Sequence, residues 1–198
     1  MIRKEKLEEL KKYIEELKTI KVESRIVDNS KKWIQSEPAN YYLNNGLVIP
    51  RERLVKGKND GSAVIIMPVL KNNEILTIIE PRVFTDLTVG IGFPAGYIEK
   101  GEEPIVGAKR ELMEETGYYP KEMFELDSFY QDEGCSSALN HLFLATNCQK
   151  VGEQKLDENE IIKYMTFTYE ELLELENLNY IKGINSKMAL VKAKKYMR

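Results

Sequence analysis

Apolar residues near the start of the chain recur at the spacing of an α-helix. Lysines and glutamates separate four aliphatic residues that stand three or four positions apart: Leu7, Leu10, Ile14 and Leu17. This pattern predicts an amphipathic helix over residues 3–20. Its apolar stripe can pack on the core of the same chain or on a partner subunit.

The remainder of the chain alternates between strand-like and helix-like patterns. Residues 21–60 hold short β-like pieces at 22–27 and 46–49 between Asn, Pro and Gly. Strands are expected at 62–70, 74–79, 92–98, 125–130, 139–145 and 161–168, and helices at 104–116, 169–175 and 185–197. The polar stretch 146–160 predicts a long loop, and such loops are often functional. Because β and α elements follow no regular βαβ order, the pattern predicts an α+β fold.

Composition narrows the class of protein. The 198 residues include 29 Lys and Arg against 32 Asp and Glu, a net charge of −3, and 42% are hydrophobic. A core-forming chain with this mild acidity is not expected to bind nucleic acid. Its apolar runs are too short to cross a membrane, and the first residues carry no secretory signal. Cys135 and Cys148 form no disulfide pattern, so we expect a cytoplasmic protein.

Three carboxylates share one face of the helix expected at 104–116. Pro104 suits the first turn of this helix and Gly117 its end. Glu111, Glu114 and Glu115 stand at i, i+3 and i+4, where like charges repel. A solvated acidic face would explain them, and so would a divalent cation such as Mg²⁺, which prefers oxygen ligands. The opposite stripe, expected to face the core, is Ile105, Ala108 and Leu112.

The surrounding residues make the second explanation the stronger one. From Gly96 to Tyr118 the chain reads G-x5-E-x7-R-E-U-x-E-E-x-G-U, where U is a bulky apolar residue. This segment resembles the Nudix box at every fixed position, with Tyr118 in place of the usual aliphatic residue. The resemblance implies a Nudix hydrolase, an α/β/α sandwich with a mixed sheet that cleaves the pyrophosphate of a nucleoside diphosphate linked to another group.

The resemblance also implies roles for residues of the box and its flanks. The metal ligands, for Mg²⁺ or alternatively Mn²⁺, would be Glu111, Glu114 and Glu115, together with the backbone carbonyl of Ala95. Arg110 and Glu102 resemble the pair that orients the helix carboxylates. Gly96 and Gly117 are structural positions of the box.

Weaker likeness points to the ADP-ribose pyrophosphatase branch. Phe93–Gly96 is similar to that branch's entry into the box, and Arg51 and Glu52 resemble a segment that lines its nucleotide site. Two positions depart from the branch: Glu133 replaces a proline and Ala138 stands where a glutamate usually falls. These departures put the preference for ADP-ribose in question while leaving the fold and the chemistry intact.

The polar loop supplies candidates for a general base. Residues 156–160 resemble an acidic loop that places a further metal ligand or a base, so Glu160 or Glu158 is expected to take the proton from a metal-bound water. The expected catalytic set is therefore Glu160, Glu158, Glu115 and Arg110, with Glu160 also a candidate metal ligand. Arg82 is a candidate phosphate contact through its planar donor fork, or an ordinary exposed arginine.

The sequence thus predicts hydrolysis of ADP-ribose to AMP and ribose 5-phosphate. Another nucleoside diphosphate sugar, a dinucleoside polyphosphate or a nucleoside triphosphate is the alternative substrate, and a nucleotide-sensing module without catalysis is the other class. Residues 1–60 are expected to form a helix and β extension that dimerises, as in relatives that complete each other's sites. Residues 61–198 would form the Nudix hydrolase domain.

Overall fold

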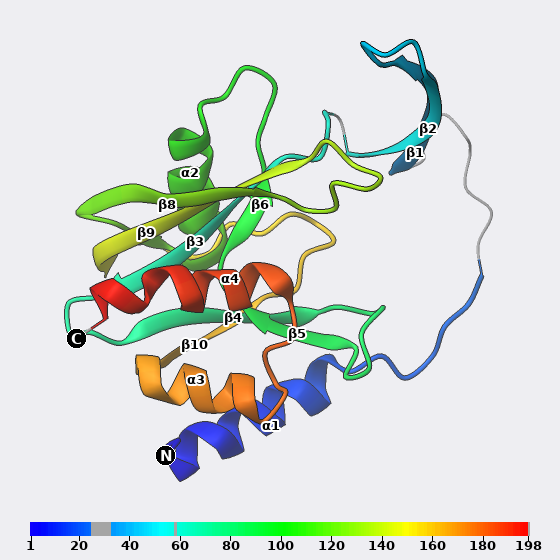
Figure 1. Ribbon diagram of the computed structural model, residues 1–198. Helices are drawn as coiled ribbons and strands as arrows, with labels where there is room; N and C mark the ends of the chain where they lie inside the picture. The colour runs from blue at the N-terminus through cyan, green and yellow to red at the C-terminus, as the bar shows by residue number, and fades with distance from the viewer. Residues whose placement is uncertain (25–32, 58, 198) are drawn as a thin grey trace.

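The computed structural model describes residues 1–24, 33–57 and 59–197 and shows a mixed α and β architecture (Figure 1). The helices are α1 (Lys4–Leu17), α2 (Pro104–Thr116), α3 (Tyr169–Asn177) and α4 (Ile184–Ala193), with a short 3-10 turn, η2 (Lys194–Tyr196). The strands are β1 (Ile34–Tyr42), β2 (Val48–Lys56), β3 (Ala63–Leu70), β4 (Ile75–Pro81), β5 (Val89–Gly92), β6 (Ala95–Tyr97), β7 (Tyr118–Tyr119), β8 (Glu122–Tyr130), β9 (Leu139–Lys150) and β10 (Lys163–Phe167).

The main sheet is mixed. Its strands run in the order β10-β4-β3-β9-β7, while β5 pairs with β4, β6 with β3 and β8 with β9. The central pair β3 and β9 is parallel, and the other pairs are antiparallel. Parallel neighbours need a crossover connection, and here α2 lies in the chain between them.

Alternate residues of the central strands face two different layers of helices. On β3, Val64 and Ile66 pack with Ala108 and Leu112 of α2. Their neighbours Ile65 and Met67 belong to a larger core that includes residues of α1, α3 and α4. Helices therefore cover both faces of the sheet, and the predicted α+β sandwich is confirmed.

The N-terminal helix uses its stripe within its own chain. Leu10 and Ile14 are buried in the larger core, and Leu7 and Leu17 pack against it. Of the two partners that the sequence leaves open, the structure selects the core of the same chain. This stripe is therefore covered and offers no surface for a second subunit.

The β1–β2 hairpin stands apart from the sandwich (Figure 1). Its strands pair with each other from Ile34↔Lys56 to Tyr42↔Val48, and every residue of β1 is exposed. The sequence predicted a short strand at 46–49 and missed β1, because an exposed strand with Pro38 among polar residues has no alternating pattern. Of the piece predicted at 22–27, residues 22–24 are not in a strand, and the rest lies outside the described residues.

Outside the hairpin, the three largest changes to the predicted bounds have local reasons. The strand expected at 92–98 is divided into β5 and β6 around Phe93–Pro94, since β5 pairs with β4 and β6 with β3. β9 continues to Lys150, so the predicted loop begins at 151 rather than 146. The helix expected at 185–197 ends at Ala193 and continues as η2.

The box helix α2 begins and ends as predicted. Pro104 is in its first turn, and Gly117 caps its end with φ of 75°, a conformation that favours glycine. One residue of the predicted core stripe differs: Ala108 and Leu112 are fully buried, but Ile105 is 37% exposed. Ile105 lies in the first turn, beyond the edge of the sheet-facing cluster.

Candidate active site

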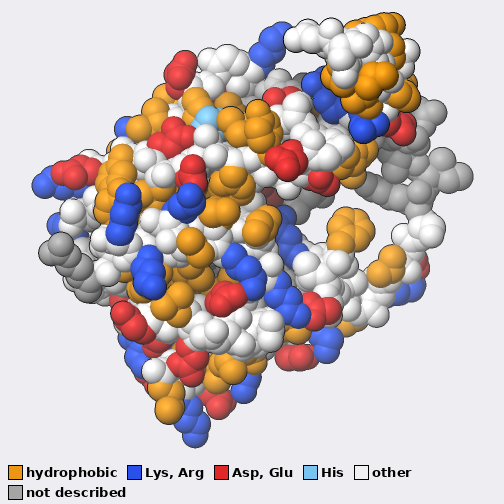
Figure 2. Space-filling view, in the orientation of Figure 1, with side chains coloured by type: hydrophobic (Ala, Val, Ile, Leu, Met, Phe, Trp, Pro, Cys, Tyr) orange, Lys and Arg blue, Asp and Glu red, His pale blue; other side chains and the backbone are white. Residues whose placement is uncertain are grey.

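A cleft of about 940 Å³ opens where the base of the β1–β2 hairpin meets the sandwich. Its walls come from β6, α2, the loop 151–162 and the start of α4, and Trp33 and Lys56 border it at the hairpin. Figure 2 shows the surface hollowed on this side of the molecule, below the hairpin. This volume is large enough to hold a nucleotide.

Four carboxylates gather at one side of this cleft. Glu111 and Glu115 come from α2, Glu80 from the end of β4 and Glu160 from the loop 151–162. Burial raises the pKa of Glu115 well above its usual range, and the charges of Glu80, Glu111 and Glu160 raise it further. Burial also raises the pKa of Glu111 and of Glu80. Such mutual repulsion marks a place where a cation would be stabilised.

Close backbone approach holds two of these carboxylates beside β6. The amide N–H of Ala95 donates to Glu115 Oε2 at 3.2 Å. A Cβ atom at Gly96 would collide with the carboxylate of Glu111, so glycine allows that carboxylate to lie where it does. The backbone of Ala95 and the helix carboxylates therefore share one small volume.

Arg110 organises the outer side of the carboxylate group. Its Nε and Nη2 bind the two oxygens of Glu102, each at 2.9 Å, in a bidentate pair. Its Nη1 reaches Glu111 at 2.7 Å and Glu114 at 3.1 Å. The hydrogen bond from Arg110 holds the pKa of Glu102 below its usual range. This is the pairing that the sequence resemblance anticipated.

Backbone hydrogen bonds fix the loop that carries Glu160 onto the end of α2. The carbonyl of Gly117 accepts from the amides of residues 151 and 152, and the carbonyl of Glu114 accepts from Lys155 N at 2.8 Å. A Cβ at Gly117 would collide with the Gly152 carbonyl, which explains glycine here beyond its positive φ. The loop is thereby positioned so that Glu160 lines the cleft.

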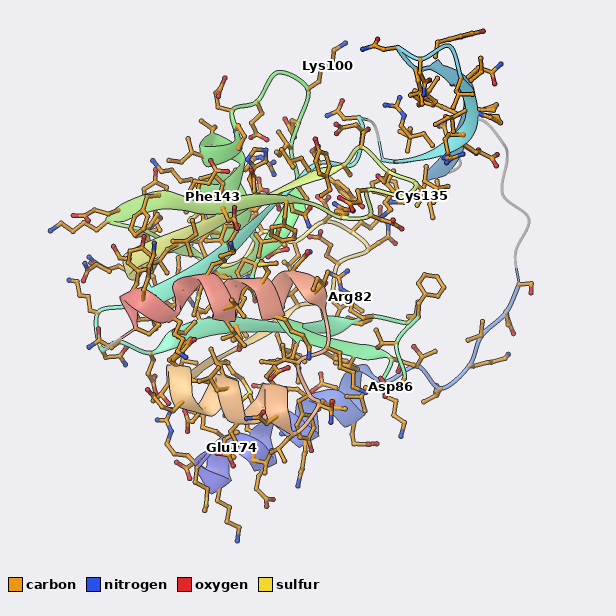
Figure 3. The ribbon with its side chains drawn as sticks, viewed as in Figure 1. Arg82, Asp86, Lys100, Cys135, Phe143 and Glu174 are labelled. Atoms are coloured by element: carbon orange, nitrogen blue, oxygen red, sulfur yellow. The ribbon has the colours of Figure 1, made fainter. Side chains whose placement is uncertain are left out.

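The structure separates the remaining candidates. Arg82 lies at the cleft beyond the end of β4 (Figure 3), where it pairs with Glu80 at 2.5 Å. Glu158 is on the same loop as Glu160 but does not line the cleft. Arg51 and Glu52 lie on the projecting hairpin and likewise do not line it; Glu52 bonds Ser36 instead.

Sequence reasoning missed Glu80. It is the one charged residue in the mostly apolar strand Ile75–Pro81, and such an isolated acid near a strand end was the available signal. Trp33 also borders the cleft, 57% exposed, with its ring edge-on to Tyr97 at 5.5 Å between centroids.

The oxygen donors of the cleft suit a divalent cation, although two of the carboxylates contact Arg110 instead of converging on one point. In the part of the chain that the structure describes, no three acidic, histidine or cysteine side chains converge tightly enough to hold a metal ion as they stand. Arg110 draws the carboxylates of Glu111 and Glu114 toward its guanidinium. The cluster around Glu115, with its raised pKa, nevertheless has the hard-oxygen chemistry that Mg²⁺ and Mn²⁺ require.

Comparison with known proteins identifies the family of this chain. The sequence model of the NUDIX domain matches residues 60–185. The chain is 37% identical to an ADP-ribose pyrophosphatase of Bacillus subtilis over 67% of this chain and 70% of the relative. It is 33% identical to a methanol dehydrogenase activator of Bacillus methanolicus, over 80% of this chain and 82% of that protein. A solved structure titled as an ADP compounds hydrolase shares the fold, with a TM-score of 0.71 and 21% identity over 91% of this chain and 94% of the other.

The chain therefore belongs to the Nudix family, and it is a Nudix pyrophosphohydrolase. Enzymes of this family generally work with divalent metal ions. Within the described residues, no helix combines the length and apolar character needed to span a membrane.

Proposed function

We propose that the enzyme hydrolyses the pyrophosphate of a nucleoside diphosphate sugar, with ADP-ribose as substrate and AMP and ribose 5-phosphate as products. The observation that carries the proposal is the group of mutually repelling carboxylates on one side of a nucleotide-sized cleft. The ADP-ribose pyrophosphatase and the ADP compounds hydrolase among its relatives support an ADP-linked substrate.

The metal would be Mg²⁺, with Mn²⁺ as the alternative. Its ligands would come from Glu111, Glu114, Glu115, Glu160 and the carbonyl of Ala95, and the position of Glu80 in the same group adds a further candidate. When bound, a divalent cation neutralises pyrophosphate charge and lowers the pKa of a coordinated water.

The chain's own residues divide the remaining work. Arg110, held by Glu102, sets the positions of the helix carboxylates. Glu160 lines the cleft and is the better placed of the two loop glutamates to accept a proton from the attacking water. Arg82 can bind a phosphate oxygen with its donor fork, and Trp33 offers an exposed face for a nucleobase.

A different sugar nucleotide is the second candidate, because two positions of the sequence depart from the ADP-ribose pattern. Ala138 stands where that branch usually has a glutamate, and its side chain is fully buried. Nearby Glu133 is exposed and does not line the cleft. Neither position therefore offers a carboxylate in the cleft to bind a substrate hydroxyl.

We propose that two copies pair through the β1–β2 hairpin. A lone two-stranded hairpin is marginally stable, and this one exposes Tyr41, Tyr42, Leu43, Leu47 and Val48 to solvent (Figure 2). Pairing would cover these side chains and would let Arg51 and Glu52 reach the cleft of the other copy. Light scattering should give a dimer, and a monomer at micromolar concentration would overturn the pairing.

We also propose a reducing, cytoplasmic setting. Both cysteines are free thiols, and burial raises the pKa of the Cys148 thiol to about 12, which keeps it unreactive. Fractionation of cells that produce the chain should recover it with the cytoplasmic fraction.

A substrate panel tests the proposed activity. Purified enzyme with Mg²⁺ is incubated with ADP-ribose, ADP-glucose, GDP-mannose, diadenosine polyphosphates and nucleoside triphosphates, and kcat/KM is ranked. ADP-ribose should rank first, with AMP and ribose 5-phosphate as products. Chelation should abolish turnover, and added Mg²⁺ or Mn²⁺ should restore it. A higher kcat/KM for another sugar nucleotide would favour the second candidate.

A further inference from the structure

Three amide side chains form a hydrogen-bonded chain across one wall of the cleft. Gln131 Nε2 donates to Asn140 Oδ1 at 2.7 Å, and Asn140 Nδ2 donates to Asn185 Oδ1 at 2.7 Å. Asn140, on β9, is fully buried, whereas Gln131 and Asn185 line the cleft. We name Gln131, Asn140 and Asn185 the amide relay. None of them belongs to the Nudix box.

The direction of the relay is set by groups that can act in only one way. The carbonyl of Gly61 can only accept, and it accepts from Gln131 Nε2 at 2.9 Å. The ammonium of Lys56 can only donate, and it donates to Gln131 Oε1 at 3.1 Å. Turning the Gln131 amide over would set oxygen against oxygen and N–H against ammonium, so its orientation is fixed.

This orientation passes along the relay to the cleft. Because Gln131 donates, Asn140 must offer its oxygen to Gln131 and its amide nitrogen to Asn185. Asn185 must then turn its oxygen toward Asn140. Its Nδ2 group remains, and among the described residues this group has no hydrogen-bond partner. The wall of the cleft thus presents a donor of fixed direction on α4.

We propose that Asn185 determines specificity by donating from Nδ2 to an acceptor oxygen of the substrate. Gln131 and Asn140 are positioning residues that hold this donor in its orientation. The inference rests on the proposed function, since a nucleoside diphosphate sugar presents such oxygens on both its phosphates and its sugars. A fixed donor selects an acceptor and rejects a donor at the same place, because either mismatch leaves polar groups unpaired.

The first test replaces Asn185 by aspartate, which keeps the shape and removes the donor. The Asn185→Asp variant should raise KM for ADP-ribose at least about tenfold and change kcat less than about threefold. An acid near the start of a helix does not harm folding. Asn177→Asp, an exposed position at the end of α3, makes the same charge change and should leave both constants unaltered.

The second test reverses the direction of the relay by changing its buried middle residue, Asn140. In Asn140→Asp the carboxylate accepts from both neighbours, so Asn185 must turn its amide and show its oxygen to the cleft. KM should rise about as far as in Asn185→Asp. In the Asn185→Ala background, Asn140→Asp should add less than about twofold, since the effect then has no route to the substrate. Circular dichroism checks folding, and Asn185→Asp decides the question if Asn140→Asp does not fold.

Inhibition by ADP identifies which oxygen accepts. ADP lacks the second sugar, so an unchanged inhibition constant in Asn185→Asp assigns the contact to a hydroxyl of that second sugar, and a weakened one assigns it to the ADP part. An unchanged KM in Asn185→Asp, or a loss confined to kcat, would overturn the inference. Wild-type failure on ADP-ribose would refute the proposed substrate instead, and the variants would then be measured on whichever substrate the panel identifies.

Discussion

Two groups of buried carboxylates lie on opposite sides of the sandwich and behave in opposite ways. Glu115 in the cleft and Glu171 at the start of α3 expose the same small fraction of their surface, 4% each, although Glu115 lies deeper in the protein. The pKa of Glu115 is raised well above its usual range, mainly by burial and then by neighbouring glutamates. Burial acts on Glu171 as well, but hydrogen bonds outweigh it and lower its pKa to about 2.

One reason that the two pKa values differ is that the fold supplies an arginine to Glu171 and, within the part of the chain that the structure describes, none to Glu115. Arg3 binds both oxygens of Glu171 at 2.7 Å and also reaches Glu74. Glu171 further accepts from the backbone amide of Thr168 in a capping box. Glu115 receives one backbone hydrogen bond, and the nearby Arg110 binds Glu102, Glu111 and Glu114 rather than Glu115.

Burial of an acid is therefore no guide to its role until its partners are counted. A carboxylate that an arginine of the same chain binds has its charge balanced and stabilises the fold. A buried acid such as Glu115, which neither Arg82 nor Arg110 binds although both pair with its neighbours, lowers stability and is retained for what it binds. Arg3, Glu74 and Glu171, which we name the α1–α3 group, therefore have a structural role. The burial of Glu115 apart from both cleft arginines supports the metal binding that we propose for the cleft.

The largest effect should follow from neutralising Glu115. Glu115→Gln should reduce kcat about 10³-fold, because the cleft loses a carboxylate that a divalent cation needs. The free energy of unfolding should stay the same or rise, since a repelling charge is removed. Steady-state kinetics and thermal melts measure the two quantities. Glu8→Gln, on the exposed face of α1, is the matched control, and full activity in Glu115→Gln would contradict the metal assignment.

The same substitution at Glu171 should do the reverse. Glu171→Gln should lower the free energy of unfolding by about 3 kcal/mol, because Arg3 loses its charged partner. Activity per folded molecule should be retained, as Glu171 is remote from the cleft. Urea unfolding followed by circular dichroism gives the free energy. A loss below about 1 kcal/mol would show that the α1–α3 group is not held by this ion pair.

Glu160 tests whether the loop belongs to the cleft group. Glu160→Gln should reduce kcat about 10²-fold, the usual contribution of a positioned base. Glu153→Gln on the same loop, 88% exposed, is the control that should retain activity. A larger loss in Glu158→Gln than in Glu160→Gln would move the role of base to Glu158.

The smallest effect concerns stability in acid. Because the folded pKa of Glu171 is about 2, below its ordinary value of 4.5, its contribution is complete above about pH 4.5. As pH falls toward 2, the wild type should lose about 2 kcal/mol of unfolding free energy from this group, after allowance for screening at Arg3. Glu171→Gln should lack this part of the loss. Urea midpoints at pH 6 and pH 3 test the difference, and parallel slopes for the two proteins would exclude it.

Much of the fold could be predicted from short-range patterns. The continuous apolar runs of β3 and β4, and the Pro104 and Gly117 bounds of α2, follow from residues that lie close in sequence. The hairpin strand β1 could not be predicted in this way. Its residues are all exposed and bury no alternating face, and the strand with which it pairs is β2.

The residues of the site likewise divide into those that local sequence patterns predict and those that only long-range packing brings together. The sequence by itself determined the spacing of Glu111, Glu114 and Glu115 on one helical turn, because helix periodicity is local. The resemblance also predicted Glu160, but only the tertiary structure showed that Glu80 joins them, and that Gln131, Asn140 and Asn185 form a relay. These residues are far apart in the chain. Their meeting depends on strand order, on the loop bonded to the end of α2 and on the packing of α4, and none of these leaves a periodic signal.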